Sequence, residues 1–365
     1  MGISAEPVAA CAAALAKAVT RPWTLMEVCG GQTHSILRWG LDQLLPPGLQ
    51  LIHGPGCPVC VTPAETLDQA LLLALGGEVT LCSYGDMLRV PGSESQSSCR
   101  DLLAARAAGG DVRVITAPLQ ALELARRHPQ RQVVLLAVGF ETTAPATALV
   151  VAQACRLGLT NLSLLMAHVR VVPAMAAVAA ADGNRVQGFL AAGHVAAVMG
   201  GDELAQLVAQ TGLPVVIAGF DPLPLLQGLL SCVELLERGR HGLVNAYAPV
   251  VRAAGNPVAR RWLERVFVPA DGEWRGFGQV SGGMLALRPA YRHLDARERF
   301  GLPGAQAPER SAESDQRCLS AAVLQGRCKP SQCPSFGTAC TPGHPLGAPM
   351  VSSEGACAAY YAYRR

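Results

Sequence analysis

Between residues 112 and 220 the sequence alternates short, continuous apolar runs with segments of helical character. The runs are rich in β-branched residues and read VRVITAP, VVLLAVGF, LSLLMAH, VAAVMG and PVVIAGF. Continuous apolar strands that alternate with helices indicate a parallel sheet that is covered on both faces. The pattern therefore predicts a doubly wound α/β domain.

A buried strand followed by a glycine-containing turn also occurs upstream of residue 118. It appears in LMEVCGG (25–31), LQLIHGPGC (49–57) and EVTLCSYG (78–85). We therefore predict two doubly wound, Rossmann-like units, over residues 20–118 and 119–222. The length of 365 residues leaves residues 223–365 for a C-terminal region that ends in a cysteine-rich iron–sulfur domain. Residues 1–19 are candidates to pack on this region.

Charge and hydropathy exclude two kinds of partner. The 30 Lys and Arg residues and the 27 Asp and Glu residues give a net charge of +3 and are scattered, so no nucleic-acid-binding surface is expected. No apolar run reaches the roughly 18 residues that a membrane span needs. No basic stretch precedes the Ala-rich run near the N-terminus, which argues against a secretory signal. We expect a cytoplasmic protein that is a monomer outside its complexes.

Thirteen cysteines point to the chemistry. In a reducing compartment, so many thiols indicate metal or redox chemistry rather than a disulfide framework. Five of them fall in the last 48 residues shown, among glycines and prolines that bend the chain. The leading assignment is a four-cysteine iron–sulfur cluster, and zinc is its main competitor. The candidate ligands are Cys318, Cys333, Cys340 and Cys357, with Cys328 as a fifth cysteine.

Two further cysteine sites follow predicted strands. Cys57 and Cys60 of HGPGCPVC have the C-x-x-C spacing of a redox-active dithiol or a metal-binding pair. Cys29 of EVCGGQTHS is followed by two glycines and His34, so the backbone around it is open and a ligand or nucleophile is favoured over simple packing. Three soft thiolates near a histidine and a carboxylate suit a thiophilic metal such as iron.

The predicted topology brings these residues together. Cys29, the C-x-x-C pair and Asp86 of SYGDMLRVPG each follow the carboxyl end of a predicted strand. Open parallel sheets bind ligands at that edge, so the three segments are expected to meet in one crevice. Glu141 and Asp221 occupy the corresponding edge of the second predicted sheet. Each either faces the same cleft or caps the helix that follows it.

Short segments spread over nearly the whole chain match one known pattern, in order. They are MEVCGGQTHSI, HGPGCPVCVTP, SYGDMLRVPGS, GFETTAP, GHVAAVMG and PMVSSEGACAAYY. Together they resemble the HypD family of nickel–iron hydrogenase maturation proteins. The resemblance implies a scaffold on which the Fe(CN)2CO group of the hydrogenase active site is assembled. It also implies two partners, a small HypC-type chaperone and a HypE-type protein that delivers cyanide from a C-terminal thiocyanate.

The resemblance implies roles for individual residues as well. The cysteine that helps to hold the iron, together with the chaperone's N-terminal cysteine, matches Cys29, and the redox-active pair matches Cys57 and Cys60. The 4Fe-4S ligands match Cys318, Cys333, Cys340 and Cys357. Relatives have further cysteines where this chain has Pro349 and the segment CLS at 318–320. Those extra positions are therefore not expected to be essential ligands.

Our leading hypothesis is a cofactor-assembly scaffold with redox activity, rather than an enzyme of ordinary turnover. Electrons would pass from the cluster through the dithiol to iron at Cys29. His34 would donate a proton or hydrogen bond there, or only make a loop hydrogen bond, while Asp86 and Glu354 would be supporting groups. The alternatives are a free-standing dithiol and iron–sulfur oxidoreductase and a zinc-stabilised binding module.

Overall fold

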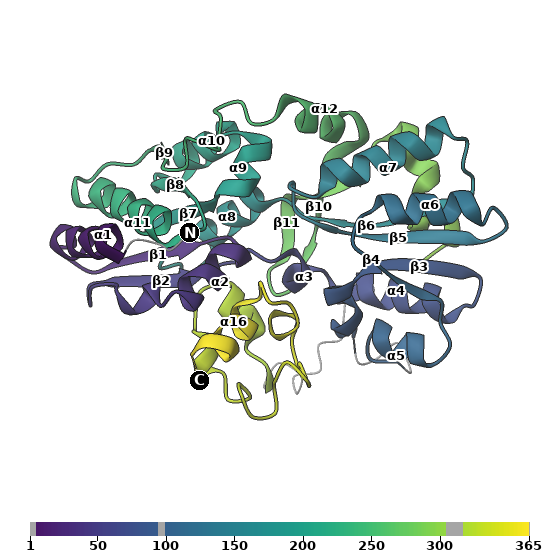
Figure 1. Ribbon diagram of the computed structural model, residues 1–365, viewed down its shortest axis with the longest axis horizontal. Helices are drawn as coiled ribbons and strands as arrows, with labels where there is room; N and C mark the ends of the chain where they lie inside the picture. Colours follow the sequence, from purple (N-terminus) through teal and green to yellow (C-terminus); the bar gives the residue numbers. More distant parts are fainter. Residues whose placement is uncertain (1–4, 94–98, 304–316, 365) are drawn as a thin grey trace.

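Two parallel sheets and a C-terminal cysteine-rich region make up the computed structural model, which describes residues 5–93, 99–303 and 317–364 (Figure 1). Sheet A, on the left, has the strand order β2-β1-β7-β8-β9, and sheet B, on the right, has the order β4-β3-β5-β6. Neighbouring strands within each sheet are parallel. The predicted α/β class with two doubly wound parallel sheets is confirmed.

Most of the strands follow the apolar runs of the sequence. The prediction is wrong for VAAVMG, which lies in the helix Gly193–Met199; the strand in this part of the chain is the preceding segment, Gly188–Ala192. β5 and β6 are buried along nearly their whole length, because helices cover the sheet on both faces. The strands of sheet A are β1 (Trp23–Glu27), β2 (Leu49–His53), β7 (Gly188–Ala192), β8 (Val215–Ala218) and β9 (Leu243–Asn245). Those of sheet B are β3 (Val79–Tyr84), β4 (Val112–Ile115), β5 (Gln132–Gly139) and β6 (Leu162–His168). An antiparallel hairpin consists of β10 (Phe267–Trp274) and β11 (Gly278–Leu287).

The α-helices lie between and around these strands. They are α1 (Ala5–Ala18), α2 (Gly30–Arg38), α3 (Pro58–Val61), α4 (Ala64–Leu75), α5 (Leu102–Ala107), α6 (Leu119–Arg127), α7 (Ala144–Arg156), α8 (Val171–Ala180), α9 (Gly193–Met199), α10 (Asp202–Thr211), α11 (Pro222–Glu237), α12 (Pro257–Val266), α13 (Ala296–Phe300), α15 (Ser320–Leu324) and α16 (Ala356–Tyr363). The short 3-10 helices are η1 (Leu41–Gln43), η2 (Gly85–Arg89), η3 (Pro289–Leu294), η4 (Pro330–Gln332) and η5 (Ala348–Met350). No helix of the described ranges is long and apolar enough to cross a membrane.

The sheets divide the chain differently from the predicted ranges 20–118 and 119–222. The chain forms β1 and β2 of sheet A, crosses to build all of sheet B, and returns at β7 to complete sheet A. The assignment of strands to the two sheets therefore corrects the predicted boundary between the two α/β units. The reason is physical: every one of these strands is a short apolar run, and pairing between parallel strands is decided by how the connecting helices pack, not by the strands' own pattern.

Helix α1 packs against α11 on sheet A. The connection that follows α1 is fixed there too, since Thr20 N and Trp23 Nε1 donate to Glu237 Oε1 at 2.8 and 2.6 Å. Although α11 lies within the predicted C-terminal region, it is part of the layer on sheet A. The described residues of the N-terminal segment therefore pack on a helix of the predicted C-terminal region, within the layer that covers sheet A.

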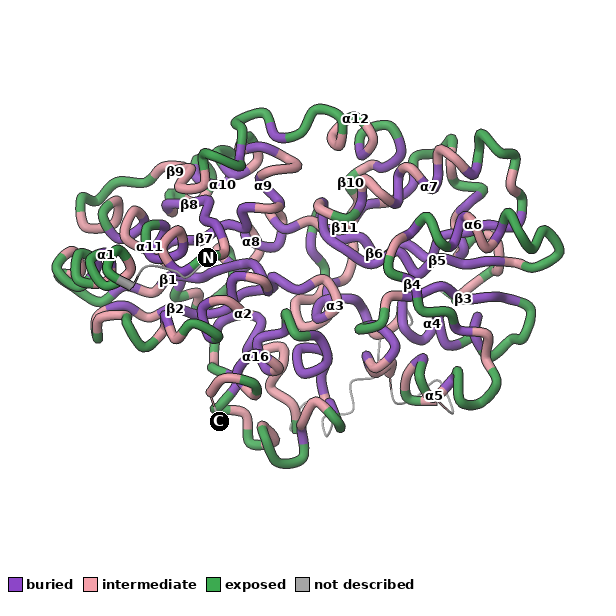
Figure 2. The backbone as a smooth tube through the Cα atoms, in the orientation of Figure 1, coloured by how far each residue is buried: buried purple, intermediate pink, exposed green. Residues whose placement is uncertain are grey.

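The buried interior follows the two sheets, and the outer faces of the surrounding helices are exposed (Figure 2). The hairpin lies between the sheets in Figure 1. Its stem residues Phe267, Leu285 and Leu287 pack into the core of sheet B, whereas Trp274 and Val280 belong to the core cluster that includes Met26 of sheet A. The hairpin therefore joins the two cores.

Candidate metal and thiol site

Cys29 lies where β1 ends and α2 begins. It has extended backbone angles at the N-cap of α2, and it is 2% exposed. Its amide donates to Glu27 Oε2 at 2.9 Å, and the same carboxylate accepts the Thr33 hydroxyl and lies 2.6 Å from His53 Nδ1. Glu27 is completely buried, so this network fixes the turn that carries the thiol.

The loop after β2 packs directly onto Cys29. Gly30 N donates to Gly56 O at 2.8 Å, and a methyl group at Gly56 would overlap the backbone N and Cα of Cys29. Only glycine therefore permits this approach, which brings the next residue, Cys57, to the same part of the sheet edge.

Cys57 and Cys60 lie on one short helical turn. Cys57 is the N-cap of α3 and Cys60 lies within it; both are free thiols and are 2% and 0% exposed. Burial raises the pKa of Cys60, and its hydrogen bond with Cys57 raises the pKa further. Both belong to the packed cluster of buried residues that contains Cys29. The three thiols that the sequence singled out thus belong to one cluster of buried residues, and their meeting in a single metal site stays a prediction.

The histidine beside Cys29 is His194, which the sequence analysis did not select. Its Nδ1 lies 3.7 Å from Cys29 Sγ, and its ring stacks on Phe220 with the centroids 5.1 Å apart. Burial lowers the pKa of His194, which favours the neutral imidazole. His194 and Phe220 follow the carboxyl ends of β7 and β8. The edge rule applied to PVVIAGF could have found Phe220, but it could not find His194, because the predicted strand VAAVMG begins after that residue.

Burial also raises the pKa of Cys29, and the nearby carboxylates of Glu27 and Glu354 add to this effect, while the backbone amides of Gln32 and Gly31 oppose it. The metal-free thiol is therefore protonated. A bound cation would replace this proton, since metals take the thiolate.

The hydrogen bonds of His34 lead to the C-terminal segment. Its Nδ1 lies 3.3 Å from Ser353 O, and its Nε2 lies 3.2 Å from the Tyr363 hydroxyl. It therefore joins α2 to the C-terminal segment, and the role that the sequence suggested for it at the thiol stays a prediction. The structure provides His194 at that position instead.

Asp86 lies at the edge of the other sheet, because β3 belongs to sheet B. Its Oδ2 accepts a hydrogen bond from the Ser352 hydroxyl at 2.7 Å. The neighbouring Glu354 packs so closely on Gly30 that a methyl group there would overlap it. Burial raises the pKa of Glu354, Asp86 adds to the effect, and His34 opposes it. The C-terminal segment thus connects Asp86 to the turn of Cys29.

Four cysteines of the C-terminal region line one small cavity, together with Val323, Phe336 and Met350. They are Cys318, Cys333, Cys340 and Cys357. Cys328 does not line the cavity. Burial raises the pKa of Cys357, and the four other thiols of the region add to this effect. A methyl group at Gly347 would lie 2.8 Å from Cys318 Sγ, so glycine gives that thiol its space.

The four thiols match the donor set of a polynuclear cluster. Within the described residues, no three His, Cys, Asp or Glu side chains are close enough together to hold one metal ion. The four thiols surround a space instead of meeting at one point. This suits a 4Fe-4S cluster, which takes one thiolate at each of its four irons, better than a single tetrahedral zinc ion.

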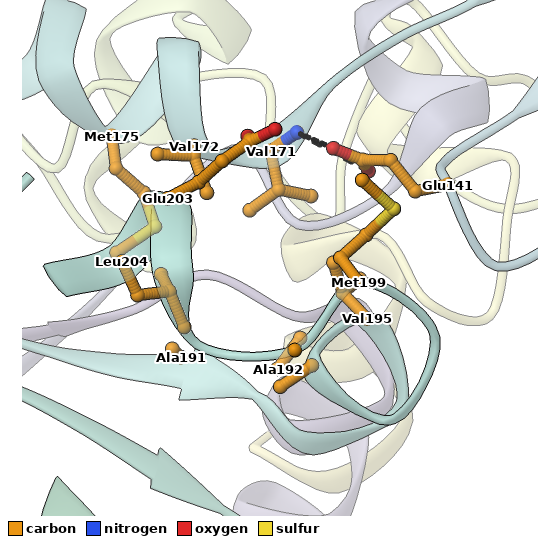
Figure 3. A pocket seen from close by; sticks show the side chains of 12 residues that line it. Glu141, Val171, Val172, Met175, Ala191, Ala192, Val195, Met199, Glu203 and Leu204 are labelled. Atoms are coloured by element: carbon orange, nitrogen blue, oxygen red, sulfur yellow. Dashed lines mark hydrogen bonds between the residues drawn. The ribbon is translucent and has the colours of Figure 1, made fainter. Parts of the chain in front are cut away.

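Glu141 and Asp221 lie on different sheets. Asp221 follows β8 of sheet A, is exposed, and makes no side-chain cap to α11. Glu141 follows β5 of sheet B and accepts a hydrogen bond from Val171 N at 3.1 Å, so it binds the first turn of α8 and not α7, which follows it. Burial raises the pKa of Glu141 to about 7. Figure 3 shows this bond beside a small apolar cavity that α8, α9 and α10 also line.

The fold and these residues define an α/β protein of two parallel sheets with three buried thiols after β1 and β2 and a pocket lined by four cysteines. The model of the HypD family, described as "Hydrogenase formation hypA family", matches residues 6–364. The hydrogenase maturation factor HypD of Rhodobacter capsulatus is 45% identical over 344 residues, which cover 94% of this chain and 90% of that protein. Those of Azotobacter vinelandii and Escherichia coli (strain K12) are 47% and 42% identical over 351 and 346 residues, with the same coverage of both chains.

The chain belongs to the HypD family. This confirms the resemblance seen in the sequence and assigns the protein a role in hydrogenase maturation.

Proposed function

We propose that this protein is the scaffold on which the Fe(CN)2CO group of nickel–iron hydrogenases is assembled, with the iron held as cargo at Cys29. The observation that carries the proposal is that Gly56, the neighbour of Cys57, packs against the backbone of Cys29, and that Cys29, Cys57 and Cys60 all belong to one cluster of buried residues. A soft metal bound there would have a ligand thiolate and a dithiol in the same place.

The first step is the loading of iron. Cys29 supplies one thiolate, and the N-terminal cysteine of a HypC-type chaperone supplies another. The thiol proton leaves as the metal binds, and the neutral His194, 3.7 Å from the sulfur, is placed to accept a hydrogen bond from it. Glu27 keeps the turn in place through the Cys29 amide.

The second step is the transfer of cyanide from the thiocyanate of a HypE-type partner. The S–C bond breaks, cyanide binds the iron with its electron pair, and the partner's sulfur needs two electrons to leave as a thiol. Cys57 and Cys60 supply both electrons when they form a disulfide. Of the two protons they release, one goes to the partner's thiolate and the other to solvent.

The electrons must then be replaced. A 4Fe-4S cluster held by Cys318, Cys333, Cys340 and Cys357 would supply single electrons close to the dithiol. Cys357, one of the four proposed cluster ligands, is near enough to Cys60 to raise the pKa of its thiol, which supports a short distance between the cluster and the dithiol. We place this chemistry in the cytoplasm, because reducing conditions keep the thiols free, and we propose that the chain is a monomer outside these complexes.

The test is anaerobic co-expression with a HypC-type chaperone and a HypE-type cyanide donor, followed by infrared spectroscopy of the purified complex. We expect cyanide and CO bands with the unaltered chain, and their loss in Cys29→Ala. Cys155→Ala, which removes an exposed thiol, is the matched control and retains the bands. Bands that persist in Cys29→Ala would remove Cys29 from the iron site. Steady disulfide turnover by the chain alone would favour a free-standing oxidoreductase.

A further inference from the structure

Helix α2, which begins directly after Cys29, packs against α16 of the cysteine-rich region (Figure 1). The contact starts at the first residue of the helix, since a methyl group at Gly30 would overlap the backbone of Glu354. The amide of Gly30 also donates to Gly56 O at 2.8 Å. The residue next to the Cys29 thiol is therefore held by two segments, the loop after β2 and the C-terminal segment.

The middle and the last turn of α2 contact the final two residues that the structure describes. His34 Nε2 lies 3.2 Å from the Tyr363 hydroxyl. Arg364 Nη2 donates to Leu37 O at 2.9 Å, and its Nε donates to Asp42 Oδ2 at 2.9 Å, just beyond the helix. The start, the middle and the end of α2 are thus all bound to one segment, residues 353–364, which we call the latch.

The latch also contributes to the four-cysteine cavity. Cys357 lines this cavity and lies in the first turn of α16. Farther along the same helix, Ala359 and Tyr360 pack with Leu37 of α2 in a separate buried cluster. A helix of eight residues has little stability of its own, because isolated helices shorter than about 12 residues are marginal in water. The position of α16 therefore depends on its contacts, and the cavity provides one of them.

We propose that the latch couples the four-cysteine cavity to the Cys29 turn: once the four cysteines hold their metal, α16 is fixed, and it holds α2 and this turn in place. The inference rests on the proposed cluster site and adds an order of events to the proposed function. The four-cysteine region is loaded first, because metal–thiolate bonds supply the stability that fixes α16. The turn that receives the iron is set only afterwards.

The test measures how fast iodoacetamide alkylates Cys29 in the full-length chain, purified anaerobically with its iron. Cys29 is 2% exposed, so it reacts when the turn opens locally, and the rate reports how firmly the turn is held. The measurement is repeated after a chelator has removed the metal. Mass spectrometry reads each cysteine separately. Cys232, a fully buried thiol of α11 on the same sheet, reports any opening of the whole layer.

We expect removal of the metal to raise the alkylation rate of Cys29 about tenfold, the effect of one or two lost hydrogen bonds, and to leave Cys232 unchanged. The double variant Tyr363→Phe with Arg364→Gln removes hydrogen bonds of the latch and keeps the four cysteines. It retains its iron and its absorbance near 400 nm, and its Cys29 reacts about tenfold faster with the metal still bound. Removal of the metal then adds less than about threefold, because both changes release the same helix.

Arg38→Gln is the matched control for the double variant. Arg38 is an exposed arginine in the last turn of α2, and its guanidinium lies over the Trp39 ring, 5.4 Å from the centroid. This substitution changes a charge on the same helix without removing a hydrogen bond of the latch. Both alkylation rates, with and without metal, stay as in the unaltered chain.

Four results would overturn the inference. An unchanged Cys29 rate after metal removal would show that the two regions are independent and would leave the proposed function intact. A full tenfold increase on metal removal in the double variant would show that the effect bypasses α16, as when the chelator strips a metal from Cys29 itself. Equal acceleration of Cys29 and Cys232 would mean that the metal stabilises the whole chain. If the purified chain has no iron and no absorbance near 400 nm, the proposed cluster fails, and this inference fails with it.

The alkylation of Cys232 also shows whether the double variant folds. If Cys232 reacts rapidly in that variant while the unaltered chain protects it, the double variant is unfolded, and Tyr363→Phe alone carries the test. This single change removes one hydroxyl group and its contact with His34. We then expect a smaller increase in the Cys29 rate, about threefold with the metal bound, and an unchanged rate would overturn the inference.

Discussion

At the scale of single residues, the position of the Cys29 thiol depends on groups that are not thiols. Glu27 is completely buried and accepts hydrogen bonds around the turn of Cys29, and His194 contacts the sulfur. A reading of the sequence for metal ligands finds the cysteines, because their spacing is informative. It cannot find Glu27, whose role arises only when β1 and β2 pair and place it against His53.

Replacing Glu27 with Gln tests this supporting role. The amide nitrogen of Gln cannot accept, so at least one of the donors from Cys29, Thr33 and His53 loses its partner in a buried site. We expect a loss of about 1–3 kcal/mol in the free energy of unfolding, measured by denaturant titration. Glu78→Gln changes an exposed carboxylate and is expected to stay within about 0.5 kcal/mol. Equal stability of the two variants would mean that the Glu27 network contributes nothing to the fold.

At the scale of elements, Glu141 connects the end of β5 to the first turn of α8. The segment GFETTAP indicates a carboxylate at a strand end, and helix capping was one of the two roles expected for it. The sequence does not reveal which helix is capped. That depends on the crossover from β6 to β7, by which α8 leaves sheet B and covers sheet A.

The stability of the protein should report the ionisation of Glu141. Its pKa of about 7 lies above the ordinary value of 4.5, so the folded chain binds this proton more tightly than the unfolded chain does. The stabilisation of the folded state by the protonated carboxyl is therefore complete below pH 4.5 and is lost as the pH rises to about 7. Glu141→Gln has no proton to lose.

We therefore expect the free energy of unfolding of the unaltered chain, relative to Glu141→Gln, to fall by about 3 kcal/mol between pH 4.5 and pH 8. Denaturant titrations of both proteins across this range measure the difference, in which ionisations common to both cancel. A difference that is independent of pH would show that Glu141 has an ordinary pKa in the folded state.

At the scale of the whole molecule, the chain builds sheet B as an insertion between β2 and β7 of sheet A. The number and place of most strands could be predicted, because each is a short apolar run with a turn after it. The assignment of strands to sheets could not, since β2 and β3 look alike to any local pattern. The hairpin that joins the two cores was also missed, because β10 alternates buried and exposed residues around Pro269 and Gly272 and resembles a loop.

The cysteine-rich region differs from the sheets in what holds it together. Between residues 317 and 364 the only α-helices are α15 and α16, of five and eight residues, and the remaining described elements there are 3-10 turns. Its buried cluster is small and includes two of the cavity cysteines, Cys340 and Cys357. A bound cluster would therefore supply much of the stability of this region, because metal–thiolate bonds replace the apolar core that it lacks.

Cysteine substitutions separate the cluster from the sheets. We expect Cys357→Ser to abolish the brown absorbance near 400 nm and the iron bound after anaerobic purification, because Cys357 lines the cavity. Cys328→Ser is the matched control: this thiol is in the same region but outside the cavity lining, so absorbance and iron content are retained.

Limited proteolysis of the Cys357→Ser chain should cut first within 317–364, while circular dichroism shows that the helices and strands of both sheets persist. If Cys328→Ser loses the iron and Cys357→Ser retains it, then Cys328 is the cluster ligand and Cys357 is not. Unfolding of the sheets in Cys357→Ser would show that the cysteine-rich region is part of their core, since the cluster would then stabilise the whole chain.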